Sequence, residues 1–417
     1  HDAIVVTVDQ ENRILRNGSI RVTDGTISSV ESTKPADRSV TTDNVIDASG
    51  KVVIPGLIDS HRHTDFTLVQ GLFSELGGEE LLKEAFALYH TAEPTLGDSF
   101  FEAAWQLACL RQLSHGVTTV NAMDFTPAFG AEAIGEAGLR GVIGPELADF
   151  LNPASADEQL ADARRFIDTY HETYDGRVTA SIAPGGEAGC SRELWEGVAE
   201  LRAEYPDLQL HTHLYDSTAG DTMAAGSGAD DPLELLDQYG LLDERTLLTH
   251  LLHADRDDAR RIADAGAHVL HCPTVYSYFQ AGKQTWFPLP ALQEFDVNVA
   301  IGLDDPFWFD SWDLIQEAKH ARLLSNFEYG AQQWSSYELL KMLTIDAARA
   351  LGLDDQIGSL EPGKRGDLVI IDVDTPRHQP YSNLPSVLMN TATAGDIETV
   401  VVDGEVLMEE RSVKSMD

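Results

Sequence analysis

Short apolar segments alternate with amphipathic segments between residues 57 and 304, and this alternation restricts the fold more than any other feature of the chain. We expect eight strands, at residues 57–61, 117–123, 140–145, 177–183, 208–213, 246–250, 267–272 and 297–304. Helical patterns occupy residues 97–114, 156–174, 191–204, 232–239, 255–265, 312–324 and 336–351. Strand–helix repeats of this kind predict an α/β fold built on a (β/α)₈ barrel, or TIM barrel.

The two ends of the chain have a different, β-rich pattern. Near the beginning, Asn17-Gly18 and Asp24-Gly25 separate apolar segments in the manner of hairpin turns. The pattern returns near the end of the chain, where apolar segments occupy residues 367–372, 397–402 and 405–408. Because the two ends share this character, we expect them to form one module. The predicted domains are a small β-sandwich built from residues 1–54 and 361–417 and a barrel formed by residues 55–360.

Charge and cysteine content narrow the range of partners and compartments. The chain has 69 acidic and 29 basic residues and a net charge of −40, so nucleic acids and anionic membranes would be repelled. Since no apolar run reaches about 18 residues, no membrane span is expected. The three cysteines, Cys109, Cys190 and Cys272, are few and widely spaced, which fits reduced thiols in a cytoplasmic protein.

The acidic excess also predicts a halophilic source. Salt screens the repulsion between like charges, so a salt-adapted protein tolerates a net charge that would destabilise others. We therefore expect activity to increase when salt is added. A salt titration with maximal activity near zero added salt would contradict this prediction.

Histidine and aspartate recur at the carboxyl ends of the predicted strands, where barrel enzymes carry their catalytic groups. The first strand is followed by His61-Arg62-His63, and strand alternation places the two histidines on one face and Arg62 on the other. Two imidazoles on one face can bind one divalent metal ion. His213, His250 and Asp304 occupy the ends of the fifth, sixth and eighth strands. Each could have a structural role alone, but their agreement indicates a common site, and Arg62 is expected in a salt bridge or an oligomer contact.

Five segments carry a resemblance to a known family. They read PGLIDSHRH, LHTHLYDS, LTHLLHAD, VNVAIGLDD and IGSLEPGKRGDLVIID. The first is similar to PGLI(D/N)xHxH, the second to HxHxxE, the third to AHCxHxxxxE and the fourth to VxVxLGTDG, and the fifth is similar to the family's return into its β-sandwich. On these segments the chain resembles the amidohydrolase superfamily, and within it the cytosine deaminase-like and chlorohydrolase-like aminohydrolases.

The resemblance implies a mononuclear metal site. His61, His63 and His213 would be ligands, with Asp304 as a further ligand or a contact to the bound water. Binuclear relatives carry a carboxylated lysine on the fourth strand, and residues 177–183 include no lysine, which favours one ion. Nitrogen and oxygen ligands with an open position suit Zn²⁺, with Fe²⁺ as the alternative.

The resemblance also implies the catalytic residues Asp304, His250 and Asp216. A zinc ion lowers the pKa of bound water from ~16 towards ~7, and Asp304 would accept the proton while His250 stabilises the attacked centre. Asp216 stands where the family has glutamate, so either it protonates the leaving nitrogen or the leaving group needs less help. Gly185 stands where thioadenosine deaminases have a substrate-contacting histidine, which argues against a nucleoside substrate.

Aromatic residues gather in the loops that follow the seventh and eighth predicted strands. Because these loops would lie at the active face of a barrel, we expect their aromatic side chains to line a pocket that binds a planar ring. The expected substrate-binding residues are His271, Tyr276, Trp286 and Trp308.

The leading hypothesis is therefore a metal-dependent hydrolase that acts on a non-peptide C–N bond and deaminates a planar nitrogen heterocycle. Hydrolytic dechlorination, alkylamine removal and ring-amide hydrolysis remain alternatives. A catalytically silent structural subunit is the non-enzyme alternative, although it would be expected to lack part of the ligand set. By analogy with proteins of this architecture, a homo-oligomer is expected.

Overall fold

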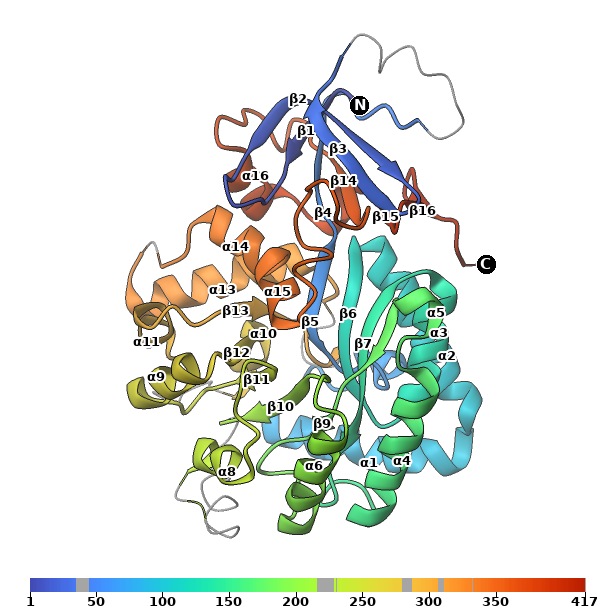
Figure 1. The fold of residues 1–417 in the computed structure, drawn as a ribbon, viewed down its shortest axis with the longest axis vertical. Helices are drawn as coiled ribbons and strands as arrows, with labels where there is room; N and C mark the ends of the chain where they lie inside the picture. Colours follow the sequence, from blue (N-terminus) through green and yellow to red (C-terminus); the bar gives the residue numbers. More distant parts are fainter. Residues whose placement is uncertain are drawn as a thin grey trace.

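The protein consists of a barrel surrounded by helices and a terminal β-sheet that lies over one end of the barrel (Figure 1). The computed structural model describes residues 1–34, 45–215, 229, 231–279, 287–306, 311–331 and 333–416. Eight parallel strands form a barrel, and eight further strands from the two chain ends form a mixed sheet that covers one end of it. The predicted fold class, a barrel with a β-module from both termini, is confirmed.

The terminal sheet joins strands from opposite ends of the chain. Its strands are β1 (Ala3–Val6), β2 (Ile14–Thr23), β3 (Thr26–Ser32), β4 (Lys51–Pro55), β14 (Leu368–Asp372), β15 (Ile397–Val402), β16 (Glu405–Glu409) and β17 (Ser412–Val413), in the order β17-β16-β15-β14-β4-β1-β2-β3. The two ends meet where β4 pairs antiparallel with β14, with Val53 opposite Ile370. Ile27 of β3 and Val406 of β16 pack in one apolar cluster although their strands lie far apart in the order, so the single sheet curls around its own core.

The barrel strands are β5 (Leu57–Arg62), β6 (Val117–Asp124), β7 (Arg140–Leu147), β8 (Val178–Ala180), β10 (Leu210–Leu214), β11 (Thr246–His250), β12 (His268–His271) and β13 (Val299–Ile301). They form two parallel sheets, β5 to β8 and β10 to β13. Parallel bridges from Ile182 to Leu210 and from Arg62 to Asp304 join the two sheets and close the barrel. The fourth predicted strand is interrupted, because β9 (Ala183–Pro184) follows β8 separately and pairs with β7.

The barrel interior is apolar at the end that faces the terminal sheet. Ile58, Val142, Leu247 and Leu270 pack there with Ala347 of α15 (Ile345–Ala350). Backbone passes from β4 into β5 at Gly56, so the chain runs from the sheet into the barrel almost without a bend (Figure 1). Apolar side chains fill this end of the barrel, so a catalytic site is expected at the opposite end. The domain limits at 54/55 and 360/361 remain predictions.

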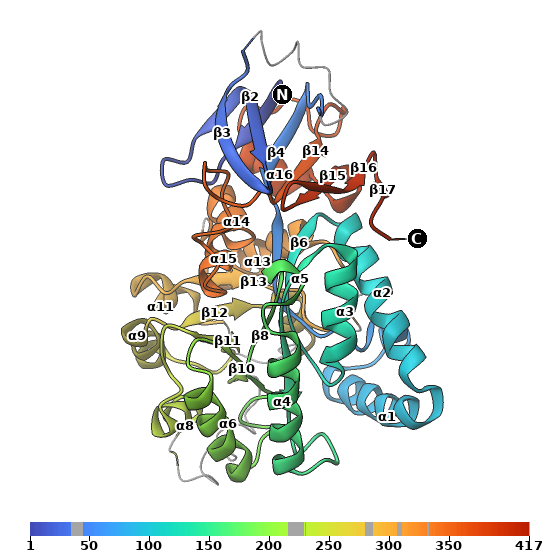
Figure 2. The ribbon, with the colours of Figure 1, turned by 45° about the vertical axis from the view of Figure 1, so that its right-hand side comes forward.

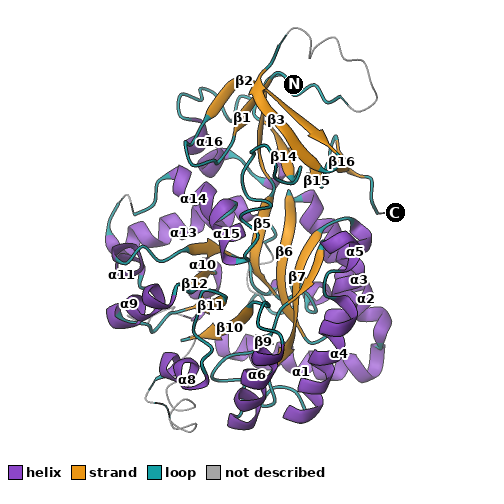
Figure 3. Ribbon diagram, in the orientation of Figure 1, coloured by secondary structure: helices purple, strands orange, loops and turns teal. Residues whose placement is uncertain are grey.

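Helices surround the barrel strands (Figure 3). They are α1 (Gly78–Leu96), α2 (Asp98–Ser114), α3 (Pro127–Ala137), α4 (Ala156–Tyr170), α5 (Thr173–Gly176), α6 (Arg192–Glu204), α8 (Pro232–Tyr239), α9 (Arg256–Ala265), α10 (Pro273–Phe279), α11 (Leu289–Glu294), α13 (Leu314–Tyr329), α14 (Ser336–Met342) and α16 (Leu384–Thr391), with short 3₁₀ turns η2 (Thr67–Val69) and η3 (Ala394–Asp396). Figure 2 shows α2 and α3 together on one flank and α9 and α11 on the opposite flank.

Helix α3 was not predicted. Its glycines explain why the sequence did not indicate a helix, and they also allow the helix to pack closely against its neighbours. Gly130 and Gly135 weaken helix propensity, yet a Cβ on Gly130 would lie 2.6 Å from the ring of Trp105 and one on Gly135 would lie 2.3 Å from Tyr174. Helices α1 and α16 were also missed. The helix predicted over residues 156–174 ends at Tyr170, because Glu172 and Tyr174 adopt left-handed backbone conformations.

Cys109, Cys190 and Cys272 are buried free thiols. Among the described residues, no helix combines the length and the apolar character that crossing a membrane requires.

Candidate active site

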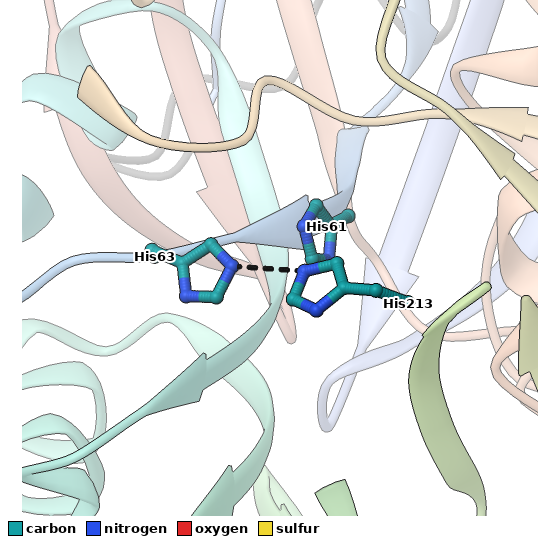
Figure 4. Close-up of side chains that lie close together, drawn as sticks. All are labelled: His61, His63 and His213. Carbon is teal, nitrogen blue, oxygen red and sulfur yellow. Dashed lines mark hydrogen bonds between the residues drawn. The ribbon is translucent and has the colours of Figure 1, made fainter. Parts of the chain in front are cut away.

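Three histidines meet at the barrel mouth. His61 and His63 come from the end of β5, and His213 comes from β10 (Figure 4). One ring nitrogen from each lies within 4.8 Å of the others, and the Nε2 atoms of His63 and His213 are 3.2 Å apart. A tetrahedral zinc site with nitrogen ligands at 2.0–2.1 Å implies about 3.3 Å between ligand nitrogens. The spacing of these two nitrogens therefore suits a shared metal ion.

Asp304 and His250 complete the cluster. The Oδ2 atom of Asp304 lies 3.7 Å from Nε2 of His61 and 3.6 Å from Nε2 of His250. His61 is fully buried, and within the described part of the chain its Nε2 atom has no hydrogen-bond partner. A buried nitrogen of this kind is costly unless something binds it. The donor set and the orphaned nitrogen both fit a divalent metal ion.

Neighbouring groups engage the outer nitrogen of each ligand ring. Nδ1 of His61 pairs with Nε2 of His211 at 2.8 Å, and Nδ1 of His213 donates to the Gly185 carbonyl at 2.9 Å. Nδ1 of His63 lies 3.5 Å from Oε2 of Glu146. Partners on the outer nitrogen orient a histidine so that Nε2 faces the metal.

Burial controls the charge of the site. Burial and the neighbouring imidazoles hold the pKa values of His61 and His250 well below the usual value, so both rings are neutral. Burial opposes protonation of His63 too, but Asp305, Glu146 and Asp304 raise its pKa well above the usual value. A bound cation would take the place of that proton.

An irregularity in β5 turns His61 into the barrel. Ile58 packs in the interior, so simple alternation would turn His61 outward. The pairing of β5 with β6 shifts between Asp59 and Arg62, and this bulge restores the inward direction. Both histidines face the site and Arg62 faces away, as predicted.

Asp304 is held against His61 by the backbone. Its N–H donates to the His61 carbonyl at 2.9 Å, and its φ of 62° is left-handed. A Cβ on Gly302 would lie 2.6 Å from the backbone nitrogen of His61, so glycine is needed for this close approach. The two chain segments are therefore locked together where their side chains meet.

His250 reaches the site through a strained backbone. Leu247 packs inside the barrel and Leu248 outside it, so alternation would place His250 on the outside. A left-handed φ of 84° at His250, followed by 58° at Leu251, breaks the alternation. The hydroxyl of Tyr276 donates to the His250 carbonyl at 2.7 Å and fixes this turn.

His271 and Tyr276 lie behind His250. The His271 ring stacks on Phe287 at 4.0 Å and its Nδ1 atom is 3.1 Å from the Tyr276 hydroxyl. Both side chains are buried, with 1% and 3% of their surface exposed. The remaining expected residues, Asp216, Trp286 and Trp308, lie outside the described residues.

The role expected for Arg62 is wrong. It is fully buried, so it cannot contact another subunit, and no carboxylate lies within salt-bridge distance of it among the described residues. Its guanidinium instead stacks 3.7 Å from the ring centre of Trp312.

Three polar residues close to the ligands were not predicted. His211 contacts His61, Glu146 contacts His63, and Oδ1 of Asp124 accepts hydrogen bonds from the backbone of Thr64. Glu146 and Asp124 each follow directly on a predicted strand. The strand-end rule would have found them, although acidic residues there often cap helices.

Comparisons with known proteins identify the family and its relatives. The model of the amidohydrolase family matches residues 52–407. The 5'-deoxyadenosine deaminase of Methanothermobacter thermautotrophicus is 30% identical over 406 residues, covering 97% of this chain and 92% of the relative. The 5-methylthioadenosine/S-adenosylhomocysteine deaminase of Thermoanaerobacter pseudethanolicus is 28% identical over 414 residues, covering 99% and 94%.

Solved structures share the fold. An adenosine deaminase from Xanthomonas campestris with bound zinc superposes with a TM-score of 0.91 at 25% identity, covering 99% of this chain and 93% of that one. The zinc-bound atrazine chlorohydrolase of Arthrobacter aurescens has a TM-score of 0.87 at 24% identity, covering 100% and 96%. The second likeness concerns the fold alone.

Proposed function

Because the chain belongs to the amidohydrolase family, we propose that it hydrolytically deaminates a planar nitrogen heterocycle with one zinc ion held by His61, His63 and His213. The convergence of these three rings with Asp304 carries the proposal. The names of the relatives support an aminopurine compound as the substrate, and their identity of about 30% supports the reaction class more strongly than the particular ring.

The residues of the mouth divide the chemistry among them. When bound, the metal ion supplies Lewis-acid activation of a water molecule. Asp304, placed between His61 and His250, accepts the proton of the attacking water. His250 is neutral and donates a hydrogen bond to the electronegative atom that gains negative charge when the neighbouring carbon is attacked. We propose that Asp216 protonates the leaving nitrogen.

We also extend the proposal to the setting of the enzyme. The three buried free thiols support a reducing, cytoplasmic compartment, and the net charge of −40 supports a halophilic source. We further propose that the protein forms a homo-oligomer and that it binds Zn²⁺ in preference to Fe²⁺.

Metal removal tests the proposed function. We expect the protein purified with Zn²⁺ to release ammonia from one or more members of a panel of purines, pyrimidines, pterins and triazines at high salt. Chelation should lower that activity by about 100-fold or more, because the metal supplies several kcal/mol of transition-state stabilisation. One equivalent of Zn²⁺ should restore it. Release of chloride or an alkylamine would favour the alternatives, and a protein that binds no transition metal would favour the silent subunit.

We predict that Tyr276→Phe lowers kcat about tenfold and leaves KM within about threefold. The substitution removes the hydroxyl that donates to the strained His250 carbonyl, and misplacement of a catalytic group affects the chemical step more than binding. Steady-state kinetics on the substrate found in the panel measures both constants. A changed KM with unchanged kcat would assign Tyr276 to the substrate wall.

Variants of His271 provide the matched control. The Tyr276 hydroxyl has one proton, which it donates to His250, so it accepts from Nδ1 of His271. Asparagine can place a donor near the Nδ1 position, whereas glutamine places it near Nε2. We expect His271→Asn to retain more activity than His271→Gln, and the reverse order would contradict the arrangement.

A further inference from the structure

The barrel closes where the segment that follows β13 meets the end of β5. Asp304 lies in this segment, and its N–H donates to the His61 carbonyl at 2.9 Å. The N–H of the preceding residue, Leu303, donates to Oδ1 of Asp59 at 3.0 Å. Within the described part of the chain no backbone carbonyl accepts a hydrogen bond from Leu303. A side chain therefore supplies the acceptor that a neighbouring strand normally provides.

Asp59 is fully enclosed at this junction. It belongs to β5, two residues before His61, and none of its surface is exposed. Its second oxygen, Oδ2, accepts a hydrogen bond from Nε2 of Gln112 on α2 at 3.1 Å. The carboxylate thus links α2 to the backbone beside Asp304. Leu303 is itself buried, so without Asp59 its N–H would lack a partner away from water, which is costly.

The position of the Asp304 carboxylate depends on the backbone that Asp59 holds. Asp304 has a left-handed φ of 62°, and its Oδ2 atom lies 3.7 Å from His61 and 3.6 Å from His250. Leu303 directly precedes this turn, so a shift of its backbone moves the carboxylate relative to both rings. A displacement of about 1 Å at a reacting group can lower a rate about 100-fold.

We propose that Asp59 is a positioning residue that aligns Asp304 for proton transfer by fixing the N–H of Leu303. The inference rests on the proposed function, in which Asp304 accepts the proton of the attacking water. The competing role for the same carboxylate is electrostatic. Burial lowers the pKa of Arg62, and Asp59 is the strongest of the carboxylates that oppose this shift. The two roles can be separated, because positioning needs a hydrogen-bond acceptor and the electrostatic role needs a charge.

Two substitutions of Asp59 distinguish the acceptor from the charge. Asp59→Asn keeps an oxygen for Leu303, and its amide can donate to Oε1 of Gln112, which is buried without a hydrogen-bond partner in the described structure, once the Gln112 amide turns over. Asp59→Leu is similar in size and has no acceptor. In Zn²⁺-loaded enzymes we expect kcat within about threefold of wild type for Asp59→Asn, and about 100-fold lower with little change in KM for Asp59→Leu. Equal losses in both variants would assign Asp59 to the charge of Arg62 and refute the proposal.

A double-mutant cycle tests whether the effect passes through Asp304. Adding Asp59→Leu to Asp304→Asn should lower kcat/KM by less than about threefold, because the proton acceptor is already absent. Asp396→Leu is the matched control, since Asp396 is also a buried carboxylate that accepts a backbone hydrogen bond, from Thr393 at 2.9 Å, but lies at the terminal sheet. It should leave kcat within about threefold of wild type. A full 100-fold loss on adding Asp59→Leu to Asp304→Asn would contradict the proposal.

A crystal structure and metal analysis complete the test. In Asp59→Leu the Asp304 carboxylate should be displaced by about 1 Å, whereas Asp59→Asn should superpose on wild type. An undisplaced carboxylate would overturn the proposal, as would a loss of bound zinc that accounts for the lower rate. If Asp59→Leu does not fold, Asp59→Glu keeps the charge, moves the acceptor by one methylene and should lower kcat about tenfold. Absence of ammonia release by wild type would overturn the proposed function, while the crystallographic comparison would still test the position of Asp304.

Discussion

Replacing Asp304 with asparagine should lower kcat/KM for ammonia release by about 10²- to 10⁴-fold, the range expected when a general base is removed. The amide has the size of the carboxylate but cannot accept the proton from water. Asparagine also tolerates the left-handed backbone found at this position, so the fold around the site should be kept. Steady-state kinetics and metal analysis on the same preparation measure the two effects separately.

Metal content distinguishes the two roles of Asp304. With three histidine ligands unchanged, we expect Asp304→Asn to retain at least half of the bound zinc. Asp346→Asn is the matched control, because Asp346 lies on α15 at the opposite end of the barrel and pairs with Arg349. It should change kcat/KM by less than about threefold. An Asp304→Asn enzyme within tenfold of wild type would show that another group accepts the proton.

Replacing Arg140 with methionine should cost about 3–5 kcal/mol of folding stability, the range for breaking a buried ion pair from one side. Arg140 begins β7, and its Nη2 atom donates to Asp367 at 3.1 Å and to Asp403 at 2.9 Å. Both Arg140 and Asp367 are buried. The substitution would leave Asp367 as an unpaired charge where the barrel meets the terminal sheet. Urea unfolding at constant high salt measures the loss.

A surface ion pair provides the control. Arg164 and Glu204 lie 2.8 Å apart, with 35% and 48% of their side chains exposed, and Arg164→Met should cost less than about 1 kcal/mol. Adding Asp367→Asn to Arg140→Met should recover part of the stability, because it removes the stranded charge. Equal losses in the Arg140 and Arg164 variants would mean that the network contributes little.

The secondary structure was predicted best where hydrophobic pattern and strand ends agree. All eight barrel strands were expected near their observed places, although the fourth is interrupted and the eighth is shorter than predicted. Helix α3 was missed because Gly130 and Gly135 are poor helix formers. These glycines allow the rings of Trp105 and Tyr174 to approach the helix closely, and a local sequence pattern does not show such contacts.

Residue types and family motifs indicated which residues form the candidate site, but strand alternation did not predict the directions in which the side chains of His61 and His250 point. The family motifs indicated His61, His63, His213, His250 and Asp304, and these five residues do converge. Alternation from the apolar residues would have turned His61 and His250 outward. A bulge in β5 and a left-handed turn after β11 reverse both directions. Substrate contacts of His271 and Tyr276 remain predictions, and the sequence did not indicate that the hydrogen bond they share reaches the backbone of His250.

The sequence by itself determined the barrel, the β-module shared by its two ends and the residue types gathered at the candidate metal site, because periodicity and residue type are local properties of a chain. Only the tertiary structure decided which ring nitrogen of His61 and of His63 faces the centre, that Arg62 stacks on Trp312, and that Glu146 lies beside His63. These outcomes depend on groups that are distant in sequence and on the backbone angles that bring them together, and tertiary packing and hydrogen bonds set those angles.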